Sequence, residues 1–121
     1  PDDGWKLVED VTSPAGTLEV EAWSFLKEGE EWVSGEEMRK RVRAQGFVLG
    51  ERHAWALLEN QHLIPEDLRK FDLVFPGTVW RGSIGGLRVP CLGWRDGRWL
   101  LHWGWLDLRW HSIVRLLRPR K

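Results

Sequence analysis

The sequence predicts an α+β fold in which an amino-terminal β-hairpin and two or three short helices precede a tryptophan-rich antiparallel sheet or a small SH3-like or OB-like barrel. Three observations predict it. Apolar and polar residues alternate near the amino terminus, helix start and stop signals lie in the middle, and short apolar runs separated by Gly- and Pro-containing turns fill residues 71–121.

The length of 121 residues suits a single domain, because a chain of this size can bury a core without disulfides or metals. We divide it into an acidic β-hairpin and loop at 1–33, a helical segment at 34–70 and a basic Trp-rich β segment at 71–121. The net charge is zero, but residues 1–78 hold nine basic against sixteen acidic residues, and residues 79–121 hold nine against two. Either the two parts dock on each other, or the basic part meets an anionic partner.

The amino-terminal hairpin is predicted from two runs at 5–11 and 17–26 that flank turn residues at 13–16. The second run alternates apolar residues with glutamates, which is typical of a half-exposed strand. The acidic stretch at 28–31 that follows is predicted to be a solvated loop.

The first helix is predicted to start at a capping box, in which the Ser34 hydroxyl accepts from an early helical N–H and Glu37 reaches back. It should stop at Gly46. Its basic residues are predicted to form a solvated face balanced by the preceding acidic stretch. A second helix is expected at 51–61 and a last helical turn at 64–68. The first pair weakly resembles a helix-turn-helix.

The central prediction is a β-hairpin with a type I′ turn at Asp96-Gly97, since this dipeptide supplies two positive-φ residues between apolar runs. A strand with a bend at Pro76-Gly77 should precede it, and a closing strand near 113–118 should follow. With a two-residue loop, the predicted cross-strand pairs are Arg95 with Arg98, Trp94 with Trp99, Leu92 with Leu101, Pro90 with Trp103, and Arg88 with Trp105.

Both faces of this hairpin are largely apolar, because the last four pairs share one face and residues such as Val89 and Cys91 occupy the other. The hairpin is therefore buried on both faces, or it buries one and offers the Trp-rich face to a ligand. Pro90 lacks a donor pointing away from the 98–106 strand, which predicts an edge or bulge on that side. The candidate ligand or partner surface consists of Arg88, Trp94, Trp99, Trp103, Trp105, Arg95, Arg98 and Arg109.

The sequence does not favour an enzyme, and no catalytic, cofactor-binding or metal-binding residue is predicted. Cys91 and His102 face each other in the predicted register, but no CxxC or HxxxH spacing accompanies them, and Cys91 lies in mid-strand as a core residue would. The glycine-rich stretch Gly82-Ser83-Ile84-Gly85-Gly86 lacks the Lys-Ser/Thr of a phosphate loop. A single cysteine and the lack of a long apolar run predict a soluble, cytoplasmic protein that does not enter a membrane.

Several motifs give the chain a family resemblance over residues 34–121. They include Phe75-Pro76-Gly77-Thr78-Val79-Trp80, Val89-Pro90-Cys91-Leu92-Gly93-Trp94 and Arg115-Leu116-Leu117-Arg118-Pro119-Arg120. In these motifs the chain resembles a family of small uncharacterised bacterial proteins. The resemblance implies a bacterial, intracellular setting and no particular activity.

The function predicted from these features is that of a small non-catalytic binding module. Its Trp/Arg-rich β surface would serve protein interaction or self-association. The alternative is that the same surface binds single-stranded RNA or DNA, because bases stack on aromatic rings while arginines follow the phosphates. The zero net charge favours a protein partner or a second copy of the chain.

Overall fold

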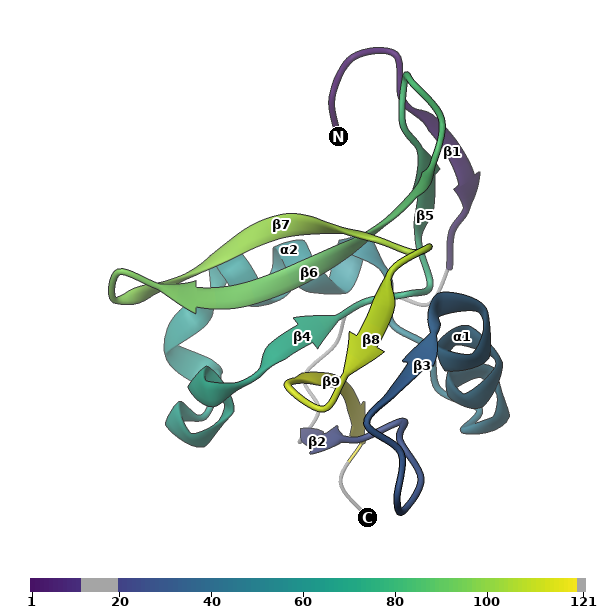
Figure 1. The fold of residues 1–121 in the computed structure, drawn as a ribbon. Helices are drawn as coiled ribbons and strands as arrows, with labels where there is room; N and C mark the ends of the chain where they lie inside the picture. Colours follow the sequence, from purple (N-terminus) through teal and green to yellow (C-terminus); the bar gives the residue numbers. More distant parts are fainter. Residues whose placement is uncertain (12–19, 120–121) are drawn as a thin grey trace.

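A computed structural model describes residues 1–11 and 20–119. These residues form two helices, two 3₁₀ turns and nine strands. Seven of the strands make a sheet that curls into a half-barrel, and the other two make a separate ribbon beside it (Figure 1). In chain order the elements are β1 (Lys6–Glu9), β2 (Val20–Trp23), β3 (Trp32–Ser34), α1 (Gly35–Ala44), α2 (Glu51–Glu59), η1 (Gln61–Leu63), η2 (Glu66–Lys70), β4 (Asp72–Val74), β5 (Val79–Arg81), β6 (Leu87–Arg95), β7 (Arg98–Trp105), β8 (Arg109–His111) and β9 (Val114–Pro119).

Strand β6 is the centre of the main sheet, whose order is β1-β5-β6-β4-β9-β2. One edge of β6 pairs with β7 along its whole length, and the other edge pairs first with β5 and then with β4. Pro90 lies at this change of partner, between Arg88 opposite Trp80 and Cys91 opposite Val74. The predicted interruption at Pro90 is therefore confirmed, as is the bend at 76–77 that separates β4 from β5.

The central hairpin has the predicted register in every pair from Arg88–Trp105 to Arg95–Arg98. Asp96 and Gly97 have φ angles of 51° and 81°, as a type I′ turn requires.

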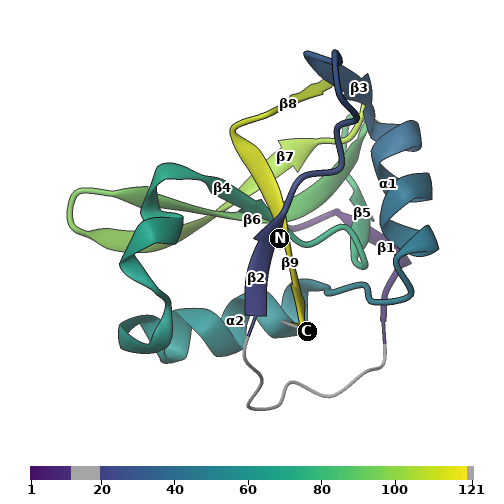
Figure 2. The same cartoon turned by 90° about the horizontal axis from the view of Figure 1, so that it is seen from below.

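Apolar residues on the two faces of the sheet belong to two separate core clusters. One contains Met38 and Val42 of α1 with Val89 and Cys91 of β6. The other contains Ala54 of α2 and residues such as Leu92 and Trp99, and Figure 2 shows the two helices on different sides of the molecule. The central part of the hairpin is thus buried on both faces, and the helices do not form a helix-turn-helix pair.

Three features differ from the sequence prediction. The amino-terminal hairpin is wrong, because β1 pairs with β5 and β2 pairs with β9, near opposite ends of the sheet; the predicted turn at 13–16 lies outside the described residues. The main sheet is not purely antiparallel, because β4 and β9 run parallel. The ribbon formed by β3 and β8 was not predicted.

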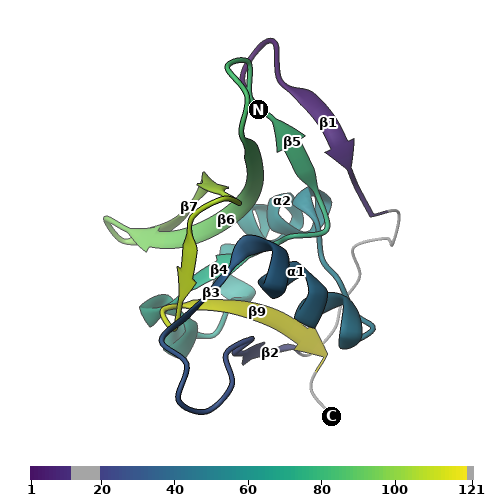
Figure 3. The same ribbon diagram turned by 45° about the vertical axis from the view of Figure 1, so that its right-hand side comes forward.

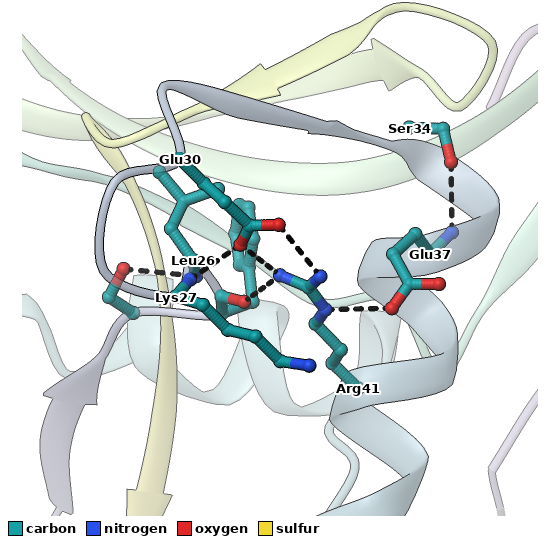
Figure 4. Close-up of polar contacts among 8 residues, drawn as sticks. Leu26, Lys27, Glu30, Ser34, Glu37 and Arg41 are labelled. Carbon is teal, nitrogen blue, oxygen red and sulfur yellow. Dashed lines mark hydrogen bonds and ion pairs between the residues drawn. The ribbon is translucent and has the colours of Figure 1, made fainter.

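Helix α1 begins as predicted, with the Ser34 hydroxyl accepting from the Glu37 N–H at 3.1 Å (Figure 4). The reciprocal half of the capping box is wrong, because the Glu37 carboxylate accepts from Arg41 Nε at 2.7 Å instead. Arg41 also donates to both carboxylate oxygens of Glu30, and the backbone N–H of Lys27 donates to the same carboxylate. The bonds from Arg41, and secondarily the bond from Lys27, lower the pKa of Glu30 to about 2. The predicted balance by the acidic stretch thus holds for Arg41 alone, because Arg39 and Arg43 pair with Glu9 of β1; Arg39 and Arg41 are also partly buried and not solvated as predicted.

Among the described residues, no helix has the length and apolar character needed to cross a membrane.

Candidate binding surface

The eight residues predicted for the ligand surface lie in three different places. The structure separates the hairpin into a tip half near the 96–97 turn and a base half near β5. Trp94 and Trp99 lie in the tip half, Arg88, Trp103 and Trp105 lie in the base half, and Arg95, Arg98 and Arg109 lie outside the Trp-rich face. The single surface predicted from the sequence is therefore divided.

The tip half of the Trp-rich face is core. Trp99 is only 1% exposed and packs edge-on against Trp94, with ring centroids 5.9 Å apart. The guanidinium of Arg69, from η2, lies 3.7 Å from the centre of the Trp94 ring. Helix α2 contributes Ala54 and η2 contributes Leu68 to the same cluster. These two tryptophans stabilise the fold and do not line an open surface.

The base half continues the same face onto β5 and β1. Directly opposite residues of antiparallel strands share a face, so Leu7, Trp80, Arg88 and Trp105 form one row across four strands. Figure 3 shows β1, β5 and the first part of β6 extending upward beyond α1. We call the following set the aromatic platform: Trp5, Leu7, Trp80, Arg88, Trp103 and Trp105.

Arg88 lies at the centre of the platform and is only 7% exposed. Its guanidinium carbon lies 3.1 Å from the ring centre of Trp105 and 5.6 Å from that of Trp5, so cation–π attraction holds it in place. One nitrogen donates to the Gly85 carbonyl at 3.5 Å. Among the described residues, no carboxylate forms an ion pair with Arg88. The platform thus contains a shielded cation without an acidic partner.

Gly86 is required beside this arginine. It has a φ of +77°, and a Cβ at this position would lie 2.6 Å from the Trp105 ring and 2.7 Å from an Arg88 nitrogen. A larger residue would push both side chains out of the platform.

Trp5, in the segment before β1, packs against Trp103. The two rings meet edge-to-face with centroids 5.3 Å apart, which is a favoured aromatic geometry. Trp5 immediately precedes β1, so the pairing of β1 with β5 carries this ring over the hairpin.

Glu51 fixes the platform to the start of α2. Its carboxylate accepts from the indole N–H of Trp80 at 2.8 Å and from that of Trp55 at 3.0 Å. Its own backbone N–H donates to the Thr78 hydroxyl at 2.7 Å, so a residue just before β5 satisfies a donor at the helix start. Trp80 is held in one orientation as a result.

The platform keeps much of its apolar surface open. Trp105 is 43% exposed and Leu7 is 49% exposed, while Trp5, Trp80 and Trp103 are partly buried. An exposed group of large apolar side chains on a regular sheet is typical of an interaction site.

The remaining predicted arginines have other neighbours. Arg95 lies on the opposite face of the hairpin, 3.5 Å from the Asp72 carboxylate, and Arg98 is paired with it across the turn. Arg109 belongs to β8, where it stacks on Trp32 at 4.4 Å. These three arginines, predicted as part of the candidate surface, do not join the aromatic platform, because strand alternation and the separate ribbon place them elsewhere.

Cys91 and His102 are directly opposite each other, as predicted. Burial, and secondarily Asp72, raises the pKa of the Cys91 thiol to about 12, which suits a core residue and not a nucleophile. Partial burial lowers the pKa of His102, Asp72 opposes this shift, and Arg95 adds to it. The described part of the chain has no group of three or more metal-ligating side chains.

A pocket of about 200 Å³ lies away from the platform, between β1 and α1. Glu9 pairs with Arg39 and Arg43 at its wall, so the charges there largely compensate one another. We assign no ligand to it.

Trp5, Leu7 and Trp80 are platform residues that the sequence did not indicate. Trp80 precedes the turn at 82–86, and strand alternation could have placed its side chain on the opposite face from those of Val79 and Arg81. Trp5 and Leu7 join the platform only through the pairing of β1 with β5, for which no local signal exists.

Comparison with protein-family models, curated protein sequences and solved structures found no match to this chain.

Proposed function

We propose that the protein is a small non-catalytic binding module and that the aromatic platform binds another protein chain. The observation that carries this proposal is a partly exposed row of large side chains around a buried arginine that has no acidic partner in the part of the chain that the structure describes. Tryptophan and arginine are the residues that most often anchor protein interfaces, because they bury a large area and bond at its margin.

Arg88 suggests the chemistry of the partner. Its guanidinium makes one long hydrogen bond, to the Gly85 carbonyl. Arg39 Nε is the one side-chain nitrogen or oxygen of the described residues that is both fully buried and unbonded, so no nitrogen of Arg88 is in that state. These nitrogens therefore retain access to solvent. A carboxylate from a partner could bond to them bidentately, which is the strongest arrangement for this pair. An apolar segment carrying an Asp or Glu side chain fits the platform best.

Single-stranded nucleic acid is the second candidate. Lys6 and Arg81 are directly opposite each other and exposed on the reverse face of β1 and β5, where phosphates could bind. However, arginines already stack on Trp32, Trp94 and Trp105, which leaves fewer ring faces for bases. This distribution supports a protein partner over RNA or DNA.

The experiment is selection of peptides from a random display library, followed by calorimetric titration of the selected peptides. We expect enrichment of acidic residues beside apolar ones, and at least about tenfold weaker binding by Trp105→Ala and Arg88→Met. Trp32→Ala is the matched control, because Trp32 is 40% exposed and stacked with an arginine but lies on the separate ribbon.

Fluorescence anisotropy with mixed RNA and DNA oligomers at about 50 mM salt forms the second arm, because electrostatic binding is strongest at low ionic strength. Oligomer binding that Trp105→Ala abolishes, without any selected peptide, would replace the protein partner by nucleic acid. Peptides that bind Trp105→Ala and Arg88→Met as well as the wild type would overturn the role of the platform.

A further inference from the structure

The outer edge of β7 has backbone groups that remain available for pairing. The Leu106 N–H donates to the Leu87 carbonyl, so alternation along the antiparallel ladder turns the N–H and C=O groups of Trp99, Leu101, Trp103 and Trp105 away from β6. In the sheet, β7 and β4 lie on opposite sides of β6, and no described strand pairs with the outer edge of β7 (Figure 1).

This free edge is short and bounded at both ends. The Gln61 side chain accepts from the Trp99 N–H at 2.8 Å and donates to the Trp99 carbonyl at 3.0 Å. At the other end, the Trp105 carbonyl accepts from Leu108 N–H at 3.2 Å, where the chain turns away. Leu101 and Trp103 lie between these ends, and their outward N–H and C=O groups have no partner among the described residues.

β7 lacks the features that usually protect an edge strand from pairing. Such edges are short, bulged, or interrupted by Lys, Pro or inward-pointing charges. The edge strand β1 has four residues, a Lys and a register shift between Leu7 and Glu9, whereas β7 has eight residues and contains no Lys, Pro, Asp or Glu. Among these strands, β7 is the one open to a further strand.

We propose that β7 pairs antiparallel with β7 of a second copy of the chain, around a two-fold axis at His102. This inference goes beyond the proposed function, since it concerns the outer edge of β7 and supplies no carboxylate of that strand to Arg88. In this register Leu101 faces the second copy's Trp103 and the reverse, while His102 faces its own counterpart. It is the two-fold register in which Leu101 and Trp103 bond only to each other, and it forms four backbone hydrogen bonds.

The side chains agree with this register. Leu101 and Trp103 share the Trp-rich face, so pairing places each beside its complement from the second copy and joins the two platforms into one apolar strip. Arg98 would face the second copy's Leu106, so no two arginines oppose each other. His102 is exposed at the axis, near Asp72 of β4 and Arg95 of β6.

The test uses the fact that position 102 faces itself. Sedimentation velocity of the full chain at about 100 μM should show a dimer, since a Kd of about 10 μM leaves most of the protein paired at this concentration. His102→Lys and His102→Glu should each raise the dissociation constant at least about tenfold, because like charges then meet at the axis. An equimolar mixture of the two variants should recover the dimer. His111→Lys, an exposed change on β8, is the control and should leave the dimer intact.

A wild-type protein that stays monomeric at about 1 mM would overturn the inference, because its dissociation constant would then be too high for a specific interface. So would full dimerisation of both single variants, or a mixture that stays monomeric. A monomeric wild type that still binds selected peptides through Trp105 would leave the proposed function standing. A dimer that responds to His102 but not to Trp105→Ala, with no peptide bound, would remove the platform's role and keep the paired edge.

Discussion

The two halves of the β6–β7 hairpin have the same kinds of side chain on the same face and opposite surroundings. In the tip half, Trp94 and Trp99 pack against residues of α2 and η2. In the base half, Trp103 packs against Trp5, and Trp105 stacks on Arg88 but remains 43% exposed. Strand alternation determines which face a residue occupies, but not whether another element covers that face. The difference between the closed core of the tip half and the partly exposed face of the base half therefore follows from the position of α2.

That position follows from contacts at both ends of the α2 region. The Thr78 hydroxyl bonds to the Glu51 N–H at the helix start, and Gln61 bonds to the Trp99 backbone just beyond its end. Together they hold α2 over the tip half and direct it away from Trp105.

The largest expected difference in stability is between two variants, each of which truncates one tryptophan of one half. Trp99→Ala should lower the free energy of unfolding by about 3 to 5 kcal/mol, because it leaves a large cavity in a closed core. Trp105→Ala should cost about 1 kcal/mol or less, since this ring is partly exposed and loses mainly its stacking on Arg88. Urea unfolding followed by circular dichroism measures both. Equal losses would contradict the distinction between the halves.

Gln61→Ala should have an intermediate effect, about 1 to 2 kcal/mol, because two hydrogen bonds to the Trp99 backbone are lost. Gln61→Glu keeps an acceptor for the Trp99 N–H but has no donor for the carbonyl, so its loss should be smaller than that of Gln61→Ala. The Trp99 amide should also exchange with deuterium faster in the alanine variant. An unchanged exchange rate would mean that Gln61 does not close this end of the β7 edge.

Local signals in the sequence predicted the parts of the fold that depend on neighbours in the chain. Asp96-Gly97 predicted the hairpin and its register, Ser34 predicted the start of α1, and Pro76-Gly77 predicted the break between β4 and β5. In each case the residue itself imposes the backbone geometry or supplies the missing hydrogen bond. The central strands of the candidate site could therefore be placed.

Pairing between distant segments could not be predicted in the same way. β1 and β2 were expected to pair because a turn signal lies between them, yet β5 and β9 offer partners that are far away in the chain. The three-residue strands β3 and β8 are too short to show a period. Since β1 brings Trp5 and Leu7 to the platform, two of its six residues depended on a long-range pair.

Trp5→Ala should have the smallest effect on stability, about 0.5 to 1 kcal/mol, which is the typical contribution of one edge-to-face aromatic contact. Trp5→Phe retains a ring for Trp103 and should remain close to the wild type. Hydrogen exchange followed by mass spectrometry should show faster exchange in β1 of the alanine variant and no change near Trp99. If Trp5→Ala instead destabilised the protein as strongly as Trp99→Ala, the base half would be a second closed core, and Trp103 and Trp105 could not serve as an open binding surface.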